Sequence, residues 1–142
     1  YTLVKGRWRF GERNVVKPLN TEARQQGERV VVVDEQGKFA RSIMRPISVS
    51  DTASLLEVKL LTGRTHQVRV HAQSEGHPVA GDPKYGDPEF NKTMKSFGVS
   101  RLFLHAASLR FRHPVTDVEL QVVAPLSDDL KAVLTKLTLS SD

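Results

Sequence analysis

Short runs in which apolar residues alternate with polar ones, or cluster with β-branched residues, recur along the chain, and this pattern is typical of β-strands. The predicted strands are residues 1–8, 29–34, 39–49, 53–61, 102–111 and 118–124. Residues 34–37 are expected to form a hairpin turn between two of them, with Gly37 free to adopt a positive φ. Pro18 and Pro46 favour strand edges or bends. We therefore expect a mostly antiparallel sheet.

Three segments have the apolar spacing and the terminal residues of helices. Residues 64–75 stop before Gly76, residues 87–97 follow Asp87 as a capping residue, and residues 127–138 follow Ser127. The remaining long segment, residues 9–28, is polar and contains several arginines, so we expect an exposed loop there. Together the elements predict an α/β protein of the α+β type, with helices flanking the sheet.

Composition narrows the classes of protein that this sequence can encode. A length of 142 residues suits one domain, and 21 Lys+Arg against 16 Asp+Glu give a net charge of +5, which favours a polyanionic partner. The absence of cysteine excludes disulfide scaffolds, thiolate metal sites and cysteine nucleophiles. No apolar run approaches the roughly 20 residues that cross a bilayer. We expect no membrane association and a cytoplasmic location.

The densest group of polar side chains lies in residues 62–71, which read TGRTHQVRVH. On a helix His66 and Arg69 would share one face, where Arg69 could offer a planar charged fork to a carboxylate or a phosphate. A solvated helix start with ordinary surface charges explains the composition equally well. His66 and His71 are five residues apart, which is not the spacing of a zinc-binding helix, so no metal site is expected.

A second polar group follows in residues 76–86, which read GHPVAGDPKYG. Asp82 is a candidate general base or nucleophile there, although an aspartate before proline in a glycine-bounded loop more often holds a turn. A hydrolase using His66 with Asp82 is a weak alternative, because the chain contains no nucleophile elbow. Phosphate-binding and dinucleotide-binding glycine loops are also absent from the sequence.

Several of these motifs occur in a fixed order. They are residues 61–71, 76–78, 81–86, 104–106 and 113–114, supported by residues 3–6 and 37–40. In this order and spacing they resemble the C-terminal half of the catalytic domain of the RluA-type pseudouridine synthases, especially the large-subunit synthase C group. The resemblance implies that residues 1–142 form the C-terminal part of one such catalytic domain. It also implies that uridines in large-subunit ribosomal RNA are isomerised to pseudouridine without a metal or an organic cofactor.

The resemblance also assigns roles to individual residues. Arg69 matches the arginine that pairs with the family's catalytic aspartate and favours its ionised form. Leu104 matches the leucine that packs against the flipped base. Arg64, His66 and Gln67 match the same motif as Arg69 and are expected to support the cleft or to contact RNA.

Two features of the family are not matched. The catalytic aspartate belongs to a His-Arg-Leu-Asp-type segment that does not occur in these 142 residues, so we expect it upstream. The family's stacking tyrosine lies six residues before the glycine that matches Gly6, whereas Tyr1 lies five before it and is one residue out of register. The alternative function is a non-catalytic RNA-binding module, with Arg64, Arg69 and the arginines of residues 9–28 on phosphates.

Overall fold

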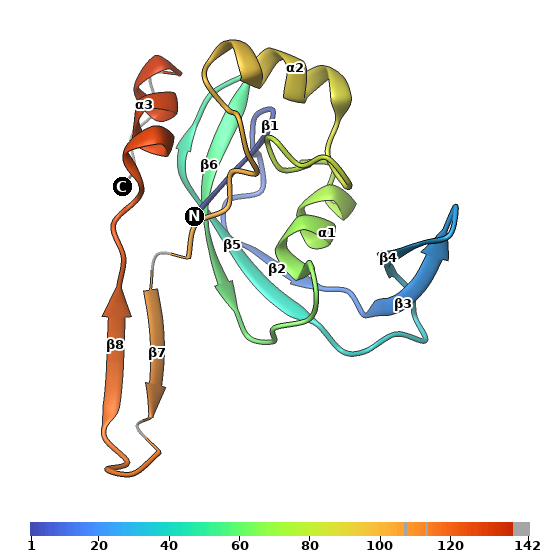
Figure 1. The fold of residues 1–142 in the computed structure, drawn as a ribbon, viewed down its shortest axis with the longest axis vertical. Helices are drawn as coiled ribbons and strands as arrows, with labels where there is room; N and C mark the ends of the chain where they lie inside the picture. The colour runs from blue at the N-terminus through green and yellow to red at the C-terminus, as the bar shows by residue number, and fades with distance from the viewer. Residues whose placement is uncertain (107, 113, 138–142) are drawn as a thin grey trace.

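The computed structural model describes residues 1–106, 108–112 and 114–137. Its main sheet has four antiparallel strands in the order β1 (Thr2–Lys5), β6 (Ala53–Leu60), β5 (Arg41–Val49) and β2 (Arg13–Val16). Two separate hairpins complete the strands, β3 (Leu19–Gln25) with β4 (Glu28–Val33) and β7 (Ser108–Arg112) with β8 (Glu119–Val123). Figure 1 shows both hairpins projecting away from the main sheet.

Helices cover both faces of the main sheet. Along β1 and β6, Leu3 and Leu55 point to one face, where α2 (Pro88–Ser96) and α3 (Asp128–Lys136) supply Met94 and Leu130. Val4 and Leu56, the next residue of each strand, point to the other face and pack with Ala72 of α1 (Gln67–Ser74). Because successive side chains alternate between faces, these strands are continuously apolar where both faces are covered. The fold class predicted from the sequence is confirmed.

The prediction of an exposed loop at residues 9–28 is wrong, because β2 and β3 lie in this segment. The β3–β4 hairpin turns at Gln26 and Gly27, which have φ of 52° and 82°, as a two-residue turn between right-twisted strands requires. Few side chains of β3 are buried, Leu19 and Thr21 among them, so its polar sequence gives little strand signal, whereas β4 corresponds to the strand predicted at residues 29–34.

The predicted hairpin turn at residues 34–37 is only partly right. Gly37 N donates to Asp34 O at 2.8 Å, so the chain does turn there. However, β4 pairs with β3 and β5 pairs with β2 and β6, so this turn does not join a hairpin. Gly37 also lacks the expected positive φ. Glycine is needed for space instead, since a Cβ at this position would lie 2.5 Å from the Leu19 carbonyl carbon.

Several other boundaries differ from those predicted. The strand expected over 102–111 begins at Ser108, while Leu104 forms an isolated bridge to Thr2. Pro46 lies at an irregularity of the β5–β6 pairing, as its ring favours. Asp87 caps α2 through Glu89 N and Phe90 N as predicted, whereas Ser127 makes no side-chain capping bond to α3. His113 and residue 138 lie outside the described residues.

Candidate active site

The site is built around the N-terminus of α1, and a buried glutamine fixes the loop that leads into it. Gln67 Nε2 donates to Arg41 O at 3.0 Å and to Ser42 Oγ at 2.9 Å. Its Oε1 accepts from Thr62 Oγ1 at 2.8 Å and from Arg64 N at 3.0 Å. Gln67 is therefore fully hydrogen-bonded inside the protein, and it ties residues 62–64 to β5.

His66 immediately precedes α1 in an unusual backbone conformation. Its φ of 55° and ψ of 23° are left-handed, a region that residues other than glycine seldom adopt and that costs free energy. The prediction that His66 and Arg69 lie on one face of a helix is wrong, because the helix begins at Gln67. The left-handed turn nevertheless directs the His66 ring to Tyr85, whose hydroxyl oxygen lies 2.8 Å from Nδ1.

Arg69 and Asp82 form a two-pronged ion pair across the site. Nε and Nη2 of Arg69 donate to the two carboxylate oxygens of Asp82 at 2.9 and 2.8 Å. The side chain of Asp82 is fully buried, and that of Arg69 is 14% exposed. Lys84 N and Tyr85 N also donate to Asp82, at 2.9 and 3.0 Å. Asp82 thus holds both the loop and the arginine, and its oxygens are committed to these donors.

The charge of this pair is stabilised by its surroundings. Burial acts to raise the pKa of Asp82, but hydrogen bonds from Arg69 and from the backbone of Tyr85 and Lys84 outweigh it and lower the pKa. Asp82 raises the pKa of Arg69 in turn, mainly through their hydrogen bonds. Both groups are therefore charged near neutral pH, which makes Arg69 a fixed cation.

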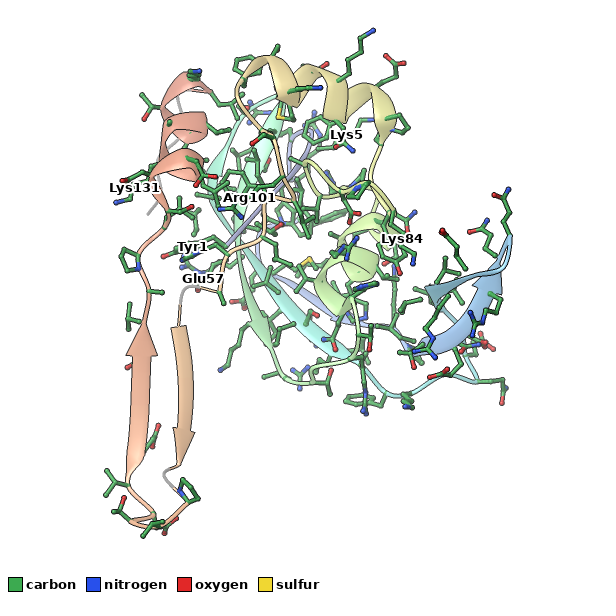
Figure 2. All side chains as sticks on the ribbon, viewed as in Figure 1. Tyr1, Lys5, Glu57, Lys84, Arg101 and Lys131 are labelled. Carbon is green, nitrogen blue, oxygen red and sulfur yellow. The ribbon has the colours of Figure 1, made fainter. Side chains whose placement is uncertain are left out.

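Tyr85 connects the parts of the site. The Arg69 guanidinium carbon lies 5.0 Å from the centre of its ring, and the His66 ring meets it edge-on with centroids 5.4 Å apart. Its hydroxyl accepts from Val31 N of β4 at 3.0 Å. Lys84 Nζ also donates to Arg29 O of the same strand. Figure 2 shows Lys84 between α1 and the β3–β4 hairpin.

Two nitrogens of this cluster have no hydrogen-bond partner within the described part of the chain. Within the part of the chain that the structure describes, every buried side-chain nitrogen or oxygen has a partner. Nη1 of Arg69 and Nε2 of His66 have no partner among the same residues, so both atoms are accessible from the surface. Arg64 is half-buried and donates from Nε to Phe39 O at 2.9 Å. The cluster therefore offers donors and positive charge to an anion or to an acceptor oxygen.

Leu104 lies on a neighbouring segment. It is half-buried and bridges to Thr2, while Phe103 N donates to Ala80 O at 2.9 Å. A Cβ on Gly81 would lie 2.2 Å from Arg101 O, so only glycine allows residues 79–82 to run this close to residues 101–104. The segment with Leu104 is thus held beside the loop that contributes Asp82.

Comparison with known proteins gives the same interpretation as the motifs. The sequence model of the RNA pseudouridylate synthase family matches residues 10–74. The ribosomal large subunit pseudouridine synthase C of Haemophilus ducreyi is 46% identical over 136 residues, covering 95% of this chain and 42% of that protein. The resemblance to the pseudouridine synthases is confirmed. The homologue with the same name from Escherichia coli K12 is 42% identical over 137 residues, covering 95% of this chain and 43% of that protein.

Solved pseudouridine synthase structures share the fold. Human RNA pseudouridylate synthase domain containing 1 superposes with a TM-score of 0.71 at 26% identity, covering 87% of this chain and 52% of that chain. Human RNA pseudouridylate synthase domain containing 4 gives a TM-score of 0.73 at 23% identity, covering 98% of this chain and 61% of that chain. The chain spans less than half the length of the bacterial pseudouridine synthases that it matches.

The structure brings some of the predicted residues together and adds others. Arg69 and His66 both contact Tyr85, and Gln67 supports the loop through Arg64 N, while the Arg64 side chain donates to Phe39 O. From the sequence, Asp82 was a candidate general base or nucleophile, with holding a turn as the more common role. Its pairing with Arg69 and the contacts of Tyr85 were not predicted. Across the described ranges, no group of three or more His, Cys, Asp or Glu side chains could hold a metal ion.

Proposed function

We propose that this chain is the C-terminal part of the catalytic domain of an enzyme that converts uridine to pseudouridine in large-subunit ribosomal RNA. The similar bacterial proteins are named ribosomal large subunit pseudouridine synthase C, and they match almost the whole chain at 42–46% identity. The net charge of +5 suits an RNA partner. Such an enzyme acts where ribosomes are assembled, so the proposal includes a cytoplasmic location.

One observation carries the catalytic part of the proposal. Asp82 occupies Nε and Nη2 of Arg69, while Nη1 has no partner in the described structure. An arginine held in this way can bind a second carboxylate without losing its own orientation. We assign that carboxylate to the aspartate of the family's His-Arg-Leu-Asp-type segment, which Arg69 would keep ionised by its positive charge.

In the proposed reaction the aspartate takes part in the chemical step, and residues of this chain position the aspartate and the RNA. With the help of the ionised aspartate, the bond from uracil N1 to the ribose is broken, and the uracil turns and rejoins the ribose through C5. C5 then releases its proton and N1 gains one, so that the atoms balance. The overall change is an isomerisation, so it requires neither an oxidant nor a group donor. The nucleotide must first leave its stack. We assign Leu104 to the packing of that base, Arg64 and His66 to contacts with RNA, and Gln67 to support of the loop.

The decisive experiment replaces Arg69 in the whole protein and measures pseudouridine formed in large-subunit ribosomal RNA. We expect Arg69→Ala to lower the rate at least about 100-fold, the scale for losing a preorganised charged donor, while RNA affinity changes little. Arg69→Lys should restore only part of the rate, because lysine lacks the planar fork. Arg45→Ala, on an exposed ion pair with Glu57, is the control.

Full activity in Arg69→Ala would overturn the role assigned to Arg69. Salt-sensitive RNA binding without any pseudouridine in the unmodified protein would instead favour the non-catalytic RNA-binding module.

A further inference from the structure

The hydroxyl of Tyr85 lies between a backbone donor and the candidate histidine. Val31 N donates to the oxygen at 3.0 Å, and His66 Nδ1 lies 2.8 Å from the same oxygen. Tyr85 is 6% exposed. This hydroxyl has no other hydrogen-bond partner in the described part of the chain.

The direction of the second hydrogen bond follows from where the hydroxyl proton can be placed. A backbone N–H can only donate, so the Tyr85 oxygen acts as the acceptor toward Val31. The hydroxyl proton then has one acceptor within reach, His66 Nδ1, and leaving a buried hydroxyl proton unpaired costs free energy. Nδ1 of His66 is therefore unprotonated, and the proton of the neutral ring is on Nε2.

The surroundings of His66 also favour the neutral ring. Burial is the largest cause lowering the pKa of His66, and the positive charges of Arg69 and Lys84 lower it further, against the smaller raising effect of Asp82. A protonated ring would also turn Nδ1 into a donor and leave the Tyr85 proton without an acceptor. The ring is thus neutral near pH 7, and its accessible Nε2 is a hydrogen-bond donor.

We propose that Tyr85 is a positioning residue, which holds His66 as the neutral Nε2–H tautomer so that His66 donates a hydrogen bond to an acceptor oxygen of the RNA beside Arg69. The role in RNA recognition rests on the proposed function. The tautomer does not, because it follows from contacts within the protein. The left-handed backbone of His66 is the strained feature that this arrangement maintains.

The first test is the nitrogen NMR spectrum of histidine-labelled whole protein. At neutral pH the His66 signals should show Nε2 protonated and Nδ1 unprotonated. In Tyr85→Phe, which keeps the ring and removes the hydroxyl, both tautomers should appear and the pKa of His66 should rise. The spectrum of the unmodified protein by itself shows which nitrogen of His66 is protonated. This result therefore does not depend on whether the Tyr85→Phe variant folds.

The second test asks whether Tyr85 acts through His66. We expect Tyr85→Phe to lower pseudouridine formation about tenfold, and to lower it no further when His66→Ala is already present, as coupled residues do. Ser54→Ala is the matched control. Its hydroxyl also accepts from a backbone N–H, that of Trp8 at 3.0 Å, and donates to a neighbouring group, Gly6 O at 2.7 Å. Ser54→Ala should reduce stability but not activity.

The outcomes separate this inference from the proposed function. A His66 ring with Nδ1 protonated in the unmodified protein would overturn the inference, as would additive losses in the double variant. The expected tautomer in a protein that forms no pseudouridine would leave the assignment of the proton intact and overturn the proposed function.

Discussion

Asp82 shows how one buried side chain can hold two parts of a site. Its carboxylate accepts from two nitrogens of Arg69 and from two backbone N–H groups of its own loop. A buried carboxylate is costly unless its charge is paired and its oxygens are hydrogen-bonded. Asp82 meets both conditions, and the position of Arg69 therefore depends on it.

Replacing Asp82 tests this dependence. Asp82→Asn keeps the shape of the side chain but removes its charge and places an amide group against the donors of Arg69. We expect the free energy of unfolding to fall by about 3 kcal/mol, as when one partner of a buried pair is lost. Denaturant unfolding of the whole protein measures the loss.

The control for that measurement is Glu57→Gln. Glu57 pairs with Arg45 at the surface, where both side chains are about half exposed, so its loss should have little effect. Equal losses in the two variants would show that the Arg69–Asp82 pair is not held as tightly as its burial implies.

Residue by residue, the sequence predicted the members of the site better than their partners. The spacing of residues 62–71 drew attention to His66 and Arg69 because charged groups are dense there. Tyr85 contacts His66, which precedes α1, and Val31 of β4. Both contacts form only when the chain folds back and brings these segments beside Tyr85. A pattern within a short stretch of sequence cannot predict contacts between residues that are far apart in the chain.

At the scale of elements, the β3–β4 hairpin is attached to the site through a small apolar cluster. Leu19 and Val31 of the hairpin pack with Ala40, Val70 and Tyr85. Leu19 also exchanges backbone hydrogen bonds with Lys38, at 2.9 and 2.8 Å, directly beside Gly37. The hairpin that supplies Val31 N to Tyr85 therefore depends on the close approach of Gly37 to β3.

Gly37→Ala should disturb that attachment. A Cβ at Gly37 would lie 2.5 to 2.8 Å from backbone atoms of Leu19 and Asn20, which cannot move aside as a flexible side chain can. Overpacking of this kind costs roughly 1–3 kcal/mol. We expect a lower free energy of unfolding and faster amide hydrogen exchange in β3 and β4.

Gly63→Ala is the matched control, since a Cβ at Gly63 meets nothing within 4 Å and Gly63 has no positive φ. We expect Gly63→Ala to change the free energy of unfolding little. Similar exchange rates in the two variants would contradict the close contact between Gly37 and β3.

The sequence predicted the elements that carry apolar or β-branched runs and missed the strands β2 and β3 of the polar segment at residues 9–28. The strands β5 and β6 and the helices α1 to α3 carry apolar residues at regular spacing because they pack against a core, and their segments were predicted. The strand β3 leaves most of its side chains at least partly exposed and has no such spacing, so it was missed, whereas its partner β4 has a run of β-branched residues and was predicted as residues 29–34. An exposed hairpin is specified by its turn and by the contacts at its base.

For the whole molecule, we expect the free energy of unfolding to fall in two stages as the pH is lowered. Burial lowers the pKa of His71, and burial with nearby cations lowers that of His66. The pKa values of Asp82 and Glu75 are also lowered, because hydrogen bonds from Arg69 to Asp82 and from Lys17 and Arg13 to Glu75 outweigh the effect of burial. The histidines therefore respond nearer neutral pH than the carboxylates.

We expect the free energy of unfolding to fall between about pH 7 and pH 5.5. The unfolded histidines take up protons below their ordinary pKa near 6.5, whereas the folded ones remain neutral until a lower pH, so protons favour the unfolded state. The loss should be on the order of 1 kcal/mol. A second loss should begin near pH 4.5, where the unfolded carboxylates become protonated first.

Denaturant unfolding at several pH values measures both stages. His66→Gln removes one of the two histidines and should reduce the slope of the first stage without changing the second. A free energy of unfolding that does not change between pH 7 and pH 5.5 would contradict the neutral state of these histidines.

The sequence by itself determined the fold class, the family resemblance and the segment that contains Arg69. Hydrophobic spacing and ordered motifs are local properties of the chain, so they can be read without coordinates. Only the tertiary structure decided that Arg69 pairs with Asp82, that Gln67 faces inward, and that Tyr85 fixes the proton of His66. These facts depend on the packing of α1 against β4, β5 and the loop at residues 81–86, which places side chains from distant parts of the chain within hydrogen-bond distance.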